Sequence, residues 1–223
     1  MKRQSLKAGP ELDHRARVGR ARRVRTETRL LAAALRVFAE KGPDSPVVDD
    51  FVRAAGISRG SFYNHHQSVP ELLEATSVWT TEGAVREIES GLEGIRSPAM
   101  RLGTGLRLFL LRAESDPVWC RFVARVWKLG PLAAPRRDLR NGLKQGELRF
   151  RDLESALDVM LGAVRQALFR IGAGRASTSY RDEVVEMCLQ AIGTPPARIA
   201  NILAAELPAL PARVTEHGAR DRT

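Results

Sequence analysis

A group of hydrogen-bonding side chains follows a glycine-containing turn in the first third of the chain. Arg59 can donate two hydrogen bonds to a guanine edge, and Asn64 can pair with adenine. Gly60 lets the backbone approach a partner closely. The remaining polar side chains, which can donate to phosphate oxygens, are Ser61, Tyr63 and His65. Together these groups have the chemistry of a surface that binds DNA.

Two short helices must position these side chains. The first is predicted because apolar residues recur at intervals of three and four, which gives one buried face. We expect this helix to begin at Ser45, with Pro46 in its first turn, and to end at Gly56, since glycine readily adopts the left-handed conformation. The apolar residues are Val48, Phe51, Val52 and Ala55.

The second helix carries the polar group. Ser58 is expected to cap it, and Ile57 with Phe62 forms a hydrophobic staple that fixes the angle between the two helices. Phe62 then faces inward, which leaves the polar residues of 59–65 on the outer side and the leading end. Two helices joined in this way form a helix-turn-helix, whose second helix lies in the DNA major groove.

Over residues 26–73 the chain resembles the TetR family of bacterial transcriptional regulators. The resemblance rests on a first helix with an apolar face, on the two helices just described, and on a further helix that opens at 68–73. Its other sequence signatures are Leu31, Leu35, Phe38, Glu40-Lys41-Gly42 and Ala55-Gly56-Ile57-Ser58. The resemblance implies that this segment is the DNA-binding domain.

The same resemblance assigns roles within that segment. It places the base-reading groups at Arg59, Gly60, Ser61, Asn64 and His65, and the phosphate contacts at Tyr63 and at the helix starts near Ser45 and Ser68. Val47 and Ser58 beside these starts complete the predicted DNA-binding set.

Two positions depart from the family pattern. His66 stands where the family usually has a phenylalanine packed under the recognition helix, which puts the local packing in question. Val69 stands where the family usually has a phosphate-binding lysine. Its loss should lower the salt slope of DNA binding by about one unit unless another cation substitutes.

The charge of the chain is concentrated at its beginning. The whole sequence has 36 Lys plus Arg and 26 Asp plus Glu, a formal net charge of +10, and residues 1–25 hold nine basic and two acidic residues, so 9 − 2 gives +7. We predict that residues 1–25 form a disordered basic arm, because they lack the apolar content to fold alone. Arg22, Arg23 and Arg25 would contact phosphates or the minor groove. The alternative is a solvated tail that only raises nonspecific affinity.

The rest of the chain has a helical pattern throughout, so the predicted fold class is all-α. A three-helix DNA-binding domain at 26–73 would be followed by an α-helical ligand-binding and dimerisation domain at 74–207 and a disordered tail at 208–223. Capping residues and breakers place the later helices at 70–90, around 102–113, 117–127, 136–144, from Asp152 to 171, 180–192 and 196–206, with Gly130-Pro131 as a break.

The resemblance implies that the two long helices at 153–171 and 180–192 form a four-helix interface in a homodimer. Such a dimer would meet two half-sites about 34 to 36 Å apart and so read an inverted repeat. The alternative is that these helices only close the monomer core. The predicted interface residues are Leu157, Leu161, Val164, Leu168, Val184, Cys188 and Ile192.

The resemblance also implies a cavity whose small-molecule ligand releases DNA, with the helix that opens at Ser68 carrying the coupling. Large side chains of the second domain could line it, although aromatic residues at helical spacing are what any bundle needs for its core. The candidates are Trp79, Phe109, Trp119, Phe122, Trp127, Met160 and Phe169, with Arg165 and Gln166 as polar partners.

Other chemistry finds little support in the sequence. Residues 56–60 match a G-x-S-x-G nucleophile motif, but that motif needs a preceding strand and here a helix precedes it. The adjacent His65 and His66 lack a metal-ligand spacing, and Cys120 and Cys188 are expected to be buried thiols. We therefore predict no catalytic residues, no metal and no cofactor.

The expected function is a cytoplasmic, ligand-responsive repressor of transcription, since no secretory signal or membrane span is evident. The alternative is a basic nucleic-acid-binding protein that acts through its arm, without sequence preference or ligand control.

Overall fold

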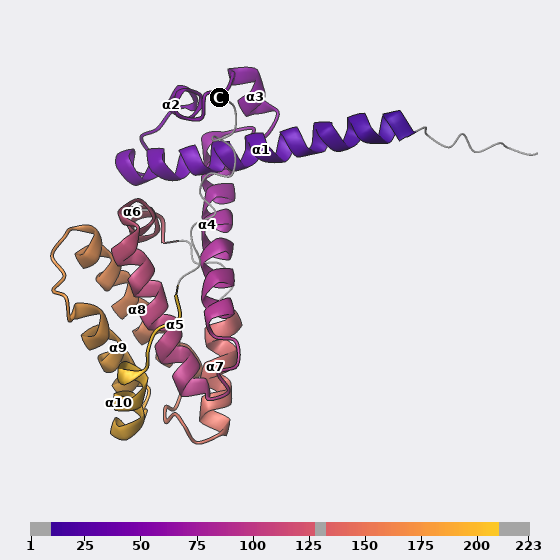
Figure 1. Ribbon diagram of the computed structural model, residues 1–223. Helices are drawn as coiled ribbons and strands as arrows, with labels where there is room; N and C mark the ends of the chain where they lie inside the picture. The colour runs from indigo at the N-terminus through magenta and orange to yellow at the C-terminus, as the bar shows by residue number, and fades with distance from the viewer. Residues whose placement is uncertain (1–9, 128–132, 210–223) are drawn as a thin grey trace, which may run out of the picture.

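The computed structural model describes residues 10–127 and 133–209, although the side chains of residues 10–13, 15 and 16 lie outside that description. Within these ranges the chain forms ten helices and no strand, which confirms the all-α fold class. Three helices make the N-terminal domain: α1 (Pro10–Lys41), α2 (Val48–Ala55) and α3 (Arg59–Tyr63). Figure 1 shows α1 as a long rod beneath α2 and α3, with its N-terminal half extending beyond them.

The second domain is a bundle built around α5. Its helices are α4 (Val69–Gly91), α5 (Pro98–Ser115), α6 (Pro117–Val126), α7 (Ala133–Lys144), α8 (Leu153–Gly172), α9 (Tyr180–Ala191) and α10 (Pro196–Ala204). α5 packs against every other helix of this set, whereas α4 also packs against α1 and so runs from one domain into the other (Figure 1). None of the described helices is long and apolar enough to cross a membrane.

Side-chain caps explain why most helix starts were predictable. Ser58, Asp116 and Asp152 each accept a hydrogen bond from a backbone N–H three residues on, at 3.1, 3.1 and 2.7 Å. Ser68 does the same for the N–H of Glu71 at 3.3 Å, while the Glu71 carboxylate accepts from the N–H of Gln67 at 2.7 Å. These bonds satisfy donors that the helix itself leaves free. The predicted break at Gly130-Pro131 lies outside the described residues.

The start of α2 was predicted wrongly. The helix begins at Val48 rather than Ser45, and Val47 is its N-cap. The carboxylate of Asp50 reaches back to accept from the N–H of Val47 at 3.0 Å and also pairs with Lys41 at 2.6 Å. This acidic cap outweighs the Ser-Pro signal, because it satisfies a backbone donor and an ion pair together. Pro46 is instead buried just before the helix.

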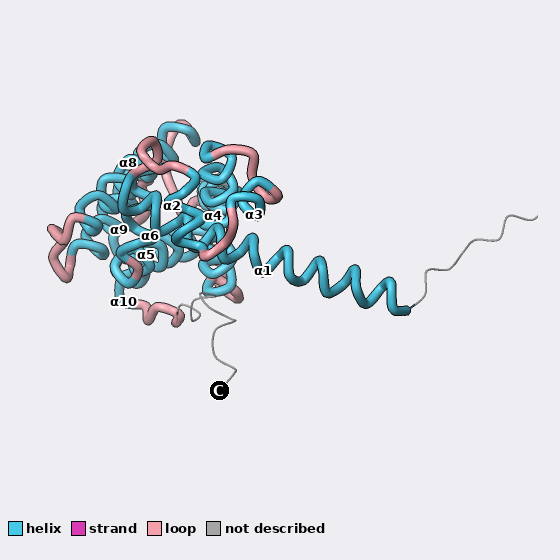
Figure 2. Tube along the Cα trace, turned by 90° about the horizontal axis from the view of Figure 1, so that it is seen from above, coloured by secondary structure: helices cyan, strands magenta, loops and turns pink. Residues whose placement is uncertain are grey.

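The prediction of a disordered arm at residues 1–25 was wrong for residues 10–25, which form the first half of α1. The C-terminal half of α1 is anchored in the domain, so extending the helix toward its N-terminus requires no new nucleation step. The Arg and Ala residues of this segment also have high helix propensity. The extension is therefore a rod and not a coil, and Figure 2 shows it pointing away from the body of the molecule. Residues 1–9 lie outside the description.

The core of the N-terminal domain continues into the second domain. Phe62 is fully buried, as predicted, and the rings of Phe38 and Phe51 lie 4.9 Å apart between α1 and α2. Phe122 of α6 joins the same cluster, with its ring 6.3 Å from that of Phe38. The two domains thus share packed side chains through α6.

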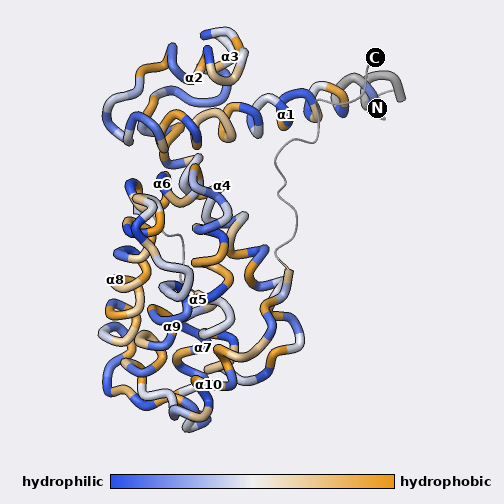
Figure 3. The backbone as a smooth tube through the Cα atoms, turned by 60° about the vertical axis from the view of Figure 1, so that its left-hand side comes forward, coloured by the Kyte–Doolittle hydropathy of each residue, from blue (hydrophilic) through white to orange (hydrophobic). Residues whose placement is uncertain are grey.

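The residues predicted for the dimer interface instead close the monomer core. Five of them are at most 5 % exposed within one protomer, and Leu161 and Val184 are half-buried against the same core. The apolar faces of α8 and α9 pack against each other and against α5. These faces are therefore already buried within one protomer. Figure 3 shows hydrophobic residues recurring among hydrophilic ones along these helices. The five buried residues are Leu157, Val164, Leu168, Cys188 and Ile192.

Candidate functional site

Most of the predicted DNA-binding residues lie on one exposed surface of the N-terminal domain. Tyr63 is 54 % exposed and Val47 61 % exposed, while Ser61 and Ser68 are half-buried. The others are also exposed: Ser45 lies before α2, Ser58, Arg59 and Gly60 lie at the turn between α2 and α3, and Asn64 lies at the end of α3. The helix-turn-helix brings these side chains together because Phe62 holds the opposite side of α3 in the core.

Arg59 is held by an acidic residue of the preceding helix. Its Nε and Nη2 donate to the two carboxylate oxygens of Asp49 at 2.7 and 2.6 Å. The hydrogen bond from Arg59 lowers the pKa of Asp49, and the same bond raises the pKa of Arg59. The guanidinium is therefore held in one orientation, and two of its three nitrogens already donate to Asp49.

His65 does not lie on the outer side of α3 as predicted. Its side chain is only 7 % exposed, and its Nδ1 pairs with one carboxylate oxygen of Glu27 on α1. His66, 6 % exposed, places Nε2 2.9 Å from the other oxygen, and its ring lies 6.4 Å from that of Phe62. The fold thus tolerates histidine at position 66. Where a phenylalanine would make an apolar contact, His66 pairs with Glu27 of α1.

A cationic groove lies between α1 and the start of α3. Arg22, Arg25 and Arg29 line one side of it, and Ser58 and Ser61 line the other. Sequence reasoning had found Arg22 and Arg25 but missed Arg29. The three arginines are three and four residues apart, so a helical reading of this segment would have placed them on one face. Guanidinium and hydroxyl groups in such a groove suit phosphate oxygens.

Arg23 lies on a different side of α1 from that groove. Its Nη2 donates to the carbonyl oxygen of Asn64 at 3.4 Å, so it holds the C-terminal end of α3. Across the residues that the structure describes, no group of three or more His, Cys, Asp or Glu side chains could hold a metal ion.

The second domain contains a cavity of about 150 Å³ between α4, α5, α6, α7 and α8. Phe109 and Trp119 form one wall, with ring centroids 5.1 Å apart and the rings edge to face. Of the residues predicted to line a ligand cavity, these two and Met160 line this one. Leu161 and Val164, which were assigned to the dimer interface, also line the cavity.

Six predicted lining residues lie elsewhere, and they are Trp79, Phe122, Trp127, Arg165, Gln166 and Phe169. Trp79, Phe122 and Trp127 pack in the core that joins the domains. Arg165, Gln166 and Phe169 are exposed on the outer side of α8, where the guanidinium of Arg165 lies 5.7 Å from the Trp127 ring. Most residues of the cavity walls are aliphatic. Because the prediction favoured large aromatic side chains, it included few of these residues.

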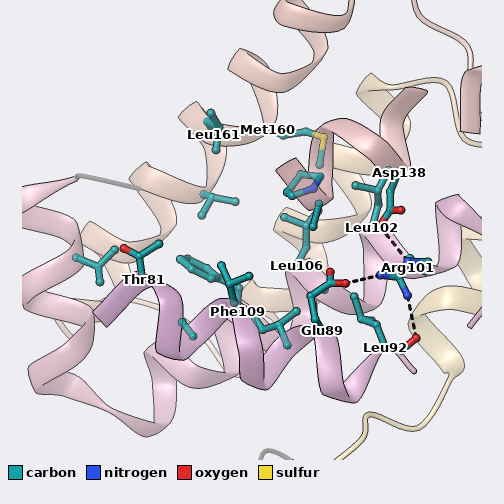
Figure 4. A pocket seen from close by; sticks show the side chains of 18 of the residues that line it. Thr81, Glu89, Leu92, Arg101, Leu102, Leu106, Phe109, Asp138, Met160 and Leu161 are labelled. Carbon is teal, nitrogen blue, oxygen red and sulfur yellow. Dashed lines mark hydrogen bonds and ion pairs between the residues drawn. The ribbon is translucent and has the colours of Figure 1, made fainter. Parts of the chain in front are cut away.

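One end of the cavity holds a cluster of paired charges. Arg101 donates to Glu89 at 2.9 Å, to Asp138 at 3.1 Å and to the carbonyl oxygen of Leu92 at 2.9 Å. Arg137 donates to the same two carboxylates at 3.3 and 3.2 Å. Two cations thus face two anions, and Figure 4 shows the cluster at the end of the cavity opposite Thr81.

The two cysteines are buried thiols, as predicted. Burial raises the pKa of Cys120 and of Cys188 to about 11 in each case. Cys120 also donates through Sγ to the carbonyl oxygen of Leu168 at 3.3 Å. Neither group has the thiolate character that reactive cysteines need.

Comparison with known proteins agrees with this geometry. A family model described as bacterial regulatory proteins of the tetR family matches residues 30–76, which span α2, α3 and the adjoining parts of α1 and α4. The HTH-type transcriptional regulator SrpR of Pseudomonas putida is 24 % identical over 179 residues, covering 74 % of this chain and 82 % of SrpR.

Solved structures share the fold at low sequence identity. RolR without ligand superposes with a TM-score of 0.65 at 24 % identity, covering 82 % of this chain and 99 % of RolR. RolR in complex with resorcinol gives 0.58 at 22 % identity, covering 85 % and 98 %. FadR from Bacillus subtilis in complex with stearoyl-CoA gives 0.64 at 14 % identity, covering 74 % and 98 %.

The matched helix-turn-helix, the all-α bundle behind it and the similarity to SrpR agree with one another. By these features residues 30–76 form a DNA-binding domain of the tetR family, and the chain as a whole is similar to regulators of that family.

Proposed function

We propose that this protein is a ligand-responsive repressor of transcription that binds an inverted-repeat operator as a homodimer and is released by a small molecule. The observation that carries the proposal is the exposed group around Arg59 and Asn64, set beside an arginine-lined groove on a TetR-family helix-turn-helix. Family members of this kind are generally DNA-binding proteins without enzymatic activity. A regulator of bacterial genes acts in the cytoplasm, where the DNA lies.

Different groups of this surface have different tasks on DNA. Arg59 and Asn64 read base edges in the major groove, and the hydroxyl groups of the surface contact phosphates. Arg22, Arg25 and Arg29 face the adjacent backbone and supply the positive charge that Val69 does not. The free half of α1, residues 10–25, is roughly 24 Å long at 1.5 Å per residue, so its arginines reach phosphates beyond those near α3.

The outward faces of α8 and α9 are the proposed dimer surface, in place of the buried faces. Val159 and Phe169 on α8 are 53 % and 42 % exposed, and Met187 on α9 is 69 % exposed. Exposed large apolar side chains on neighbouring helices favour a protein partner. A second copy would cover them and place two recognition helices on one operator.

Two helices connect the cavity to the DNA-binding surface. α4 lines the cavity along its second half and begins beside α3 at Ser68. α6 contributes Trp119 and Val123 to the cavity, and its Arg125 donates to the carbonyl oxygens of Ala39 and Glu40 at 2.9 and 3.0 Å. A ligand that favours one placement of α4 and α6 changes the spacing of the recognition helices, and the same coupling weakens DNA binding.

Ligand control is also supported by the complexes of RolR with resorcinol and FadR with stearoyl-CoA, whose folds this chain shares. The second candidate function is nonspecific binding to nucleic acid through the basic half of α1. It is favoured by the length of that basic helix, which points away from the body of the molecule (Figure 2).

The first experiment measures binding of the purified protein to the DNA flanking its own gene at physiological salt. An Arg59→Ala, Asn64→Ala double variant is compared with an Arg140→Ala, Gln145→Ala control, which removes a cation and an amide from exposed positions near the end of α7. Saturable binding to a short inverted repeat, lost only in the first variant, supports a sequence-reading dimer. Equal, salt-sensitive binding of all three proteins to any DNA supports the nonspecific alternative.

A further inference from the structure

The cavity of the second domain has a size and a polarity that together describe its ligand. We propose that it binds a small uncharged and largely apolar molecule of about one aromatic ring. This inference rests on the proposed function, because it names the chemical class of the effector.

The size and the walls of the cavity set the first limit. Its volume is about 150 Å³, and apolar protein cavities of that size hold a single benzene ring. Leu102 and Leu106 of α5 and Met160 of α8 face it across from α4, and the Phe109 ring stands among them (Figure 4). Aliphatic and aromatic walls of this kind favour a compact apolar molecule over a long chain.

The charges at one end of the cavity set the second limit. Among the described residues that line the cavity, Arg101 is the only cation, and its three donor nitrogens already bond to Glu89, Asp138 and the Leu92 carbonyl oxygen. A carboxylate or phosphate ligand would find no free cation among these residues and would face two carboxylates. Transfer of an unpaired charge into such a site is costly, so a charged ligand is excluded.

Trp119 closes one wall of the cavity. It is 2 % exposed, and its edge-to-face contact with Phe109 holds the indole in place. The indole Nε1 is buried and out of reach of a water-sized molecule, so this wall presents an apolar surface to a ligand and no free donor.

Calorimetry on the full-length protein, without DNA, tests the proposal with three probes of similar size. Acetophenone carries a carbonyl oxygen, α-methylstyrene has the same shape without it, and benzoate carries a charge. We expect both uncharged probes to bind and benzoate to bind at least about tenfold more weakly than acetophenone. Benzoate binding as tightly as acetophenone would overturn the inference, as would a failure of both uncharged probes to bind at millimolar concentration.

The location is tested by filling the cavity. A Cβ added at Gly105 meets Leu92 and Ile88 at 3.6 and 3.7 Å, both ordinary contacts with lining residues, so Gly105→Leu should place its bulk there and abolish acetophenone binding. Gly83→Leu on α4 is the control, since a Cβ at Gly83 meets nothing within 4 Å. Unchanged binding in a folded Gly105→Leu variant, judged by its thermal melt, would contradict the site.

These measurements separate the inference from the proposed function. Acetophenone that binds with the expected probe and variant pattern, but leaves operator binding unchanged, would support the site and count against ligand control. Operator binding that responds to a charged compound and not to acetophenone would keep ligand control and overturn this inference.

Discussion

The two domains of this protein shift the pKa values of their acidic side chains in opposite directions. In the N-terminal domain, hydrogen bonds from Arg59 and Lys41 lower the pKa values of Asp49 and Asp50, so the charged forms are favoured. In the second domain, burial raises the pKa values of Cys120 and Cys188 to about 11, so the neutral forms are favoured. Exposed cations line the groove beside α3, whereas the charges at the cavity neutralise one another.

This difference means that the two domains suit different partners. The surface around α3 keeps its ion pairs in water, where they are individually weak and can be exchanged for contacts with phosphates. Because the pKa values of Asp49 and Asp50 are lowered, their pairs persist at neutral pH and are lost only as the pH falls below about 4. The walls of the cavity are mostly apolar and the charges at its end are paired, so it suits an apolar ligand. The predictions below test this contrast.

The largest expected difference is in salt dependence. DNA binding should weaken by about 10³-fold to 10⁵-fold between 50 and 200 mM salt if the dimer contacts about six to ten phosphates. Binding of acetophenone to the cavity should change by less than about twofold, because no counterions are released. Fluorescence titrations with labelled operator and calorimetry with acetophenone, at four salt concentrations, measure both.

The same titration tests the groove directly. Arg29→Gln should lower the salt slope by about one unit for each protomer, while Arg140→Gln on α7 should leave it unchanged. An unchanged slope in Arg29→Gln would show that this arginine does not meet a phosphate. A steep salt dependence of acetophenone binding would contradict the contrast between the domains.

The second prediction compares the loss of one carboxylate in each domain. Asp138 is 5 % exposed and bonds to Arg101 and Arg137, so Asp138→Ala leaves both cations, of which Arg101 is mostly buried, to share the single carboxylate of Glu89. The free energy of unfolding should fall by about 3 kcal/mol, which lowers the melting temperature by roughly 6 to 12 °C for a chain of this length. Asp49→Ala breaks an exposed pair and should leave the melting temperature within experimental error.

Calorimetric melts of both variants at pH 7 and low salt check this pair of outcomes. A similar loss of stability in the two variants would mean that the Arg59 pair contributes to folding as much as the buried cluster does. The ion pairs of the two domains would then contribute equally to stability, and exposure to water would not distinguish them.

The third prediction concerns the two thiols. With each pKa raised to about 11, two units above the ordinary 9.0, the thiolate fraction at pH 8 is about a hundredfold smaller than for an exposed cysteine. A thiol reagent should therefore label neither residue in the native protein at pH 8, and should label both in 6 M guanidinium. Rapid labelling of Cys188 in the native state would show that α9 opens and that its interior is wetter than the structure indicates.

The sequence predicted the N-terminal domain in more detail than the second domain, for a physical reason. Caps such as Ser58 and Asp152 act within three residues, and the burial of Phe62 follows from the spacing of a short helix. Local signals therefore located most helices and the exposed polar group of α3. The start of α2 was missed because the capping carboxylate, Asp50, lies after the helix start that the Ser-Pro pattern suggests.

Long-range packing accounts for the other errors. No local pattern indicates that Glu27 on α1 pairs with both His65 and His66. Nor does any local pattern indicate that Leu161 lines a cavity while Leu157 is buried in the core. The helical state of residues 10–25 was missed because the segment was judged alone, without the helix to which it is attached. The sequence indicated which helices exist, but it could not indicate how their faces are shared among neighbours.

The last and smallest expected effect is on communication between the domains. Arg125 on α6 donates from Nη1 to the carbonyl oxygens of Ala39 and Glu40 near the C-terminal end of α1, while Trp119 on the same helix lines the cavity. Arg125→Ala removes this link and touches neither the cavity nor the surface around α3. Acetophenone affinity and operator affinity should each stay within about twofold of wild type. The factor by which acetophenone weakens operator binding should fall about twofold to thirtyfold, the range for changes along a coupling element.

Arg121→Ala is the matched control, because Arg121 is a half-buried cation of the same helix that makes neither contact with α1. Operator titrations with and without saturating acetophenone give the coupling factor for each protein. An unchanged factor in Arg125→Ala would assign the coupling to α4 alone, since α4 is the other helix that both lines the cavity and packs against α1. A reduced factor would mean that the polar end of α1 and the apolar cavity communicate through α6, whose two ends belong to the two environments contrasted above.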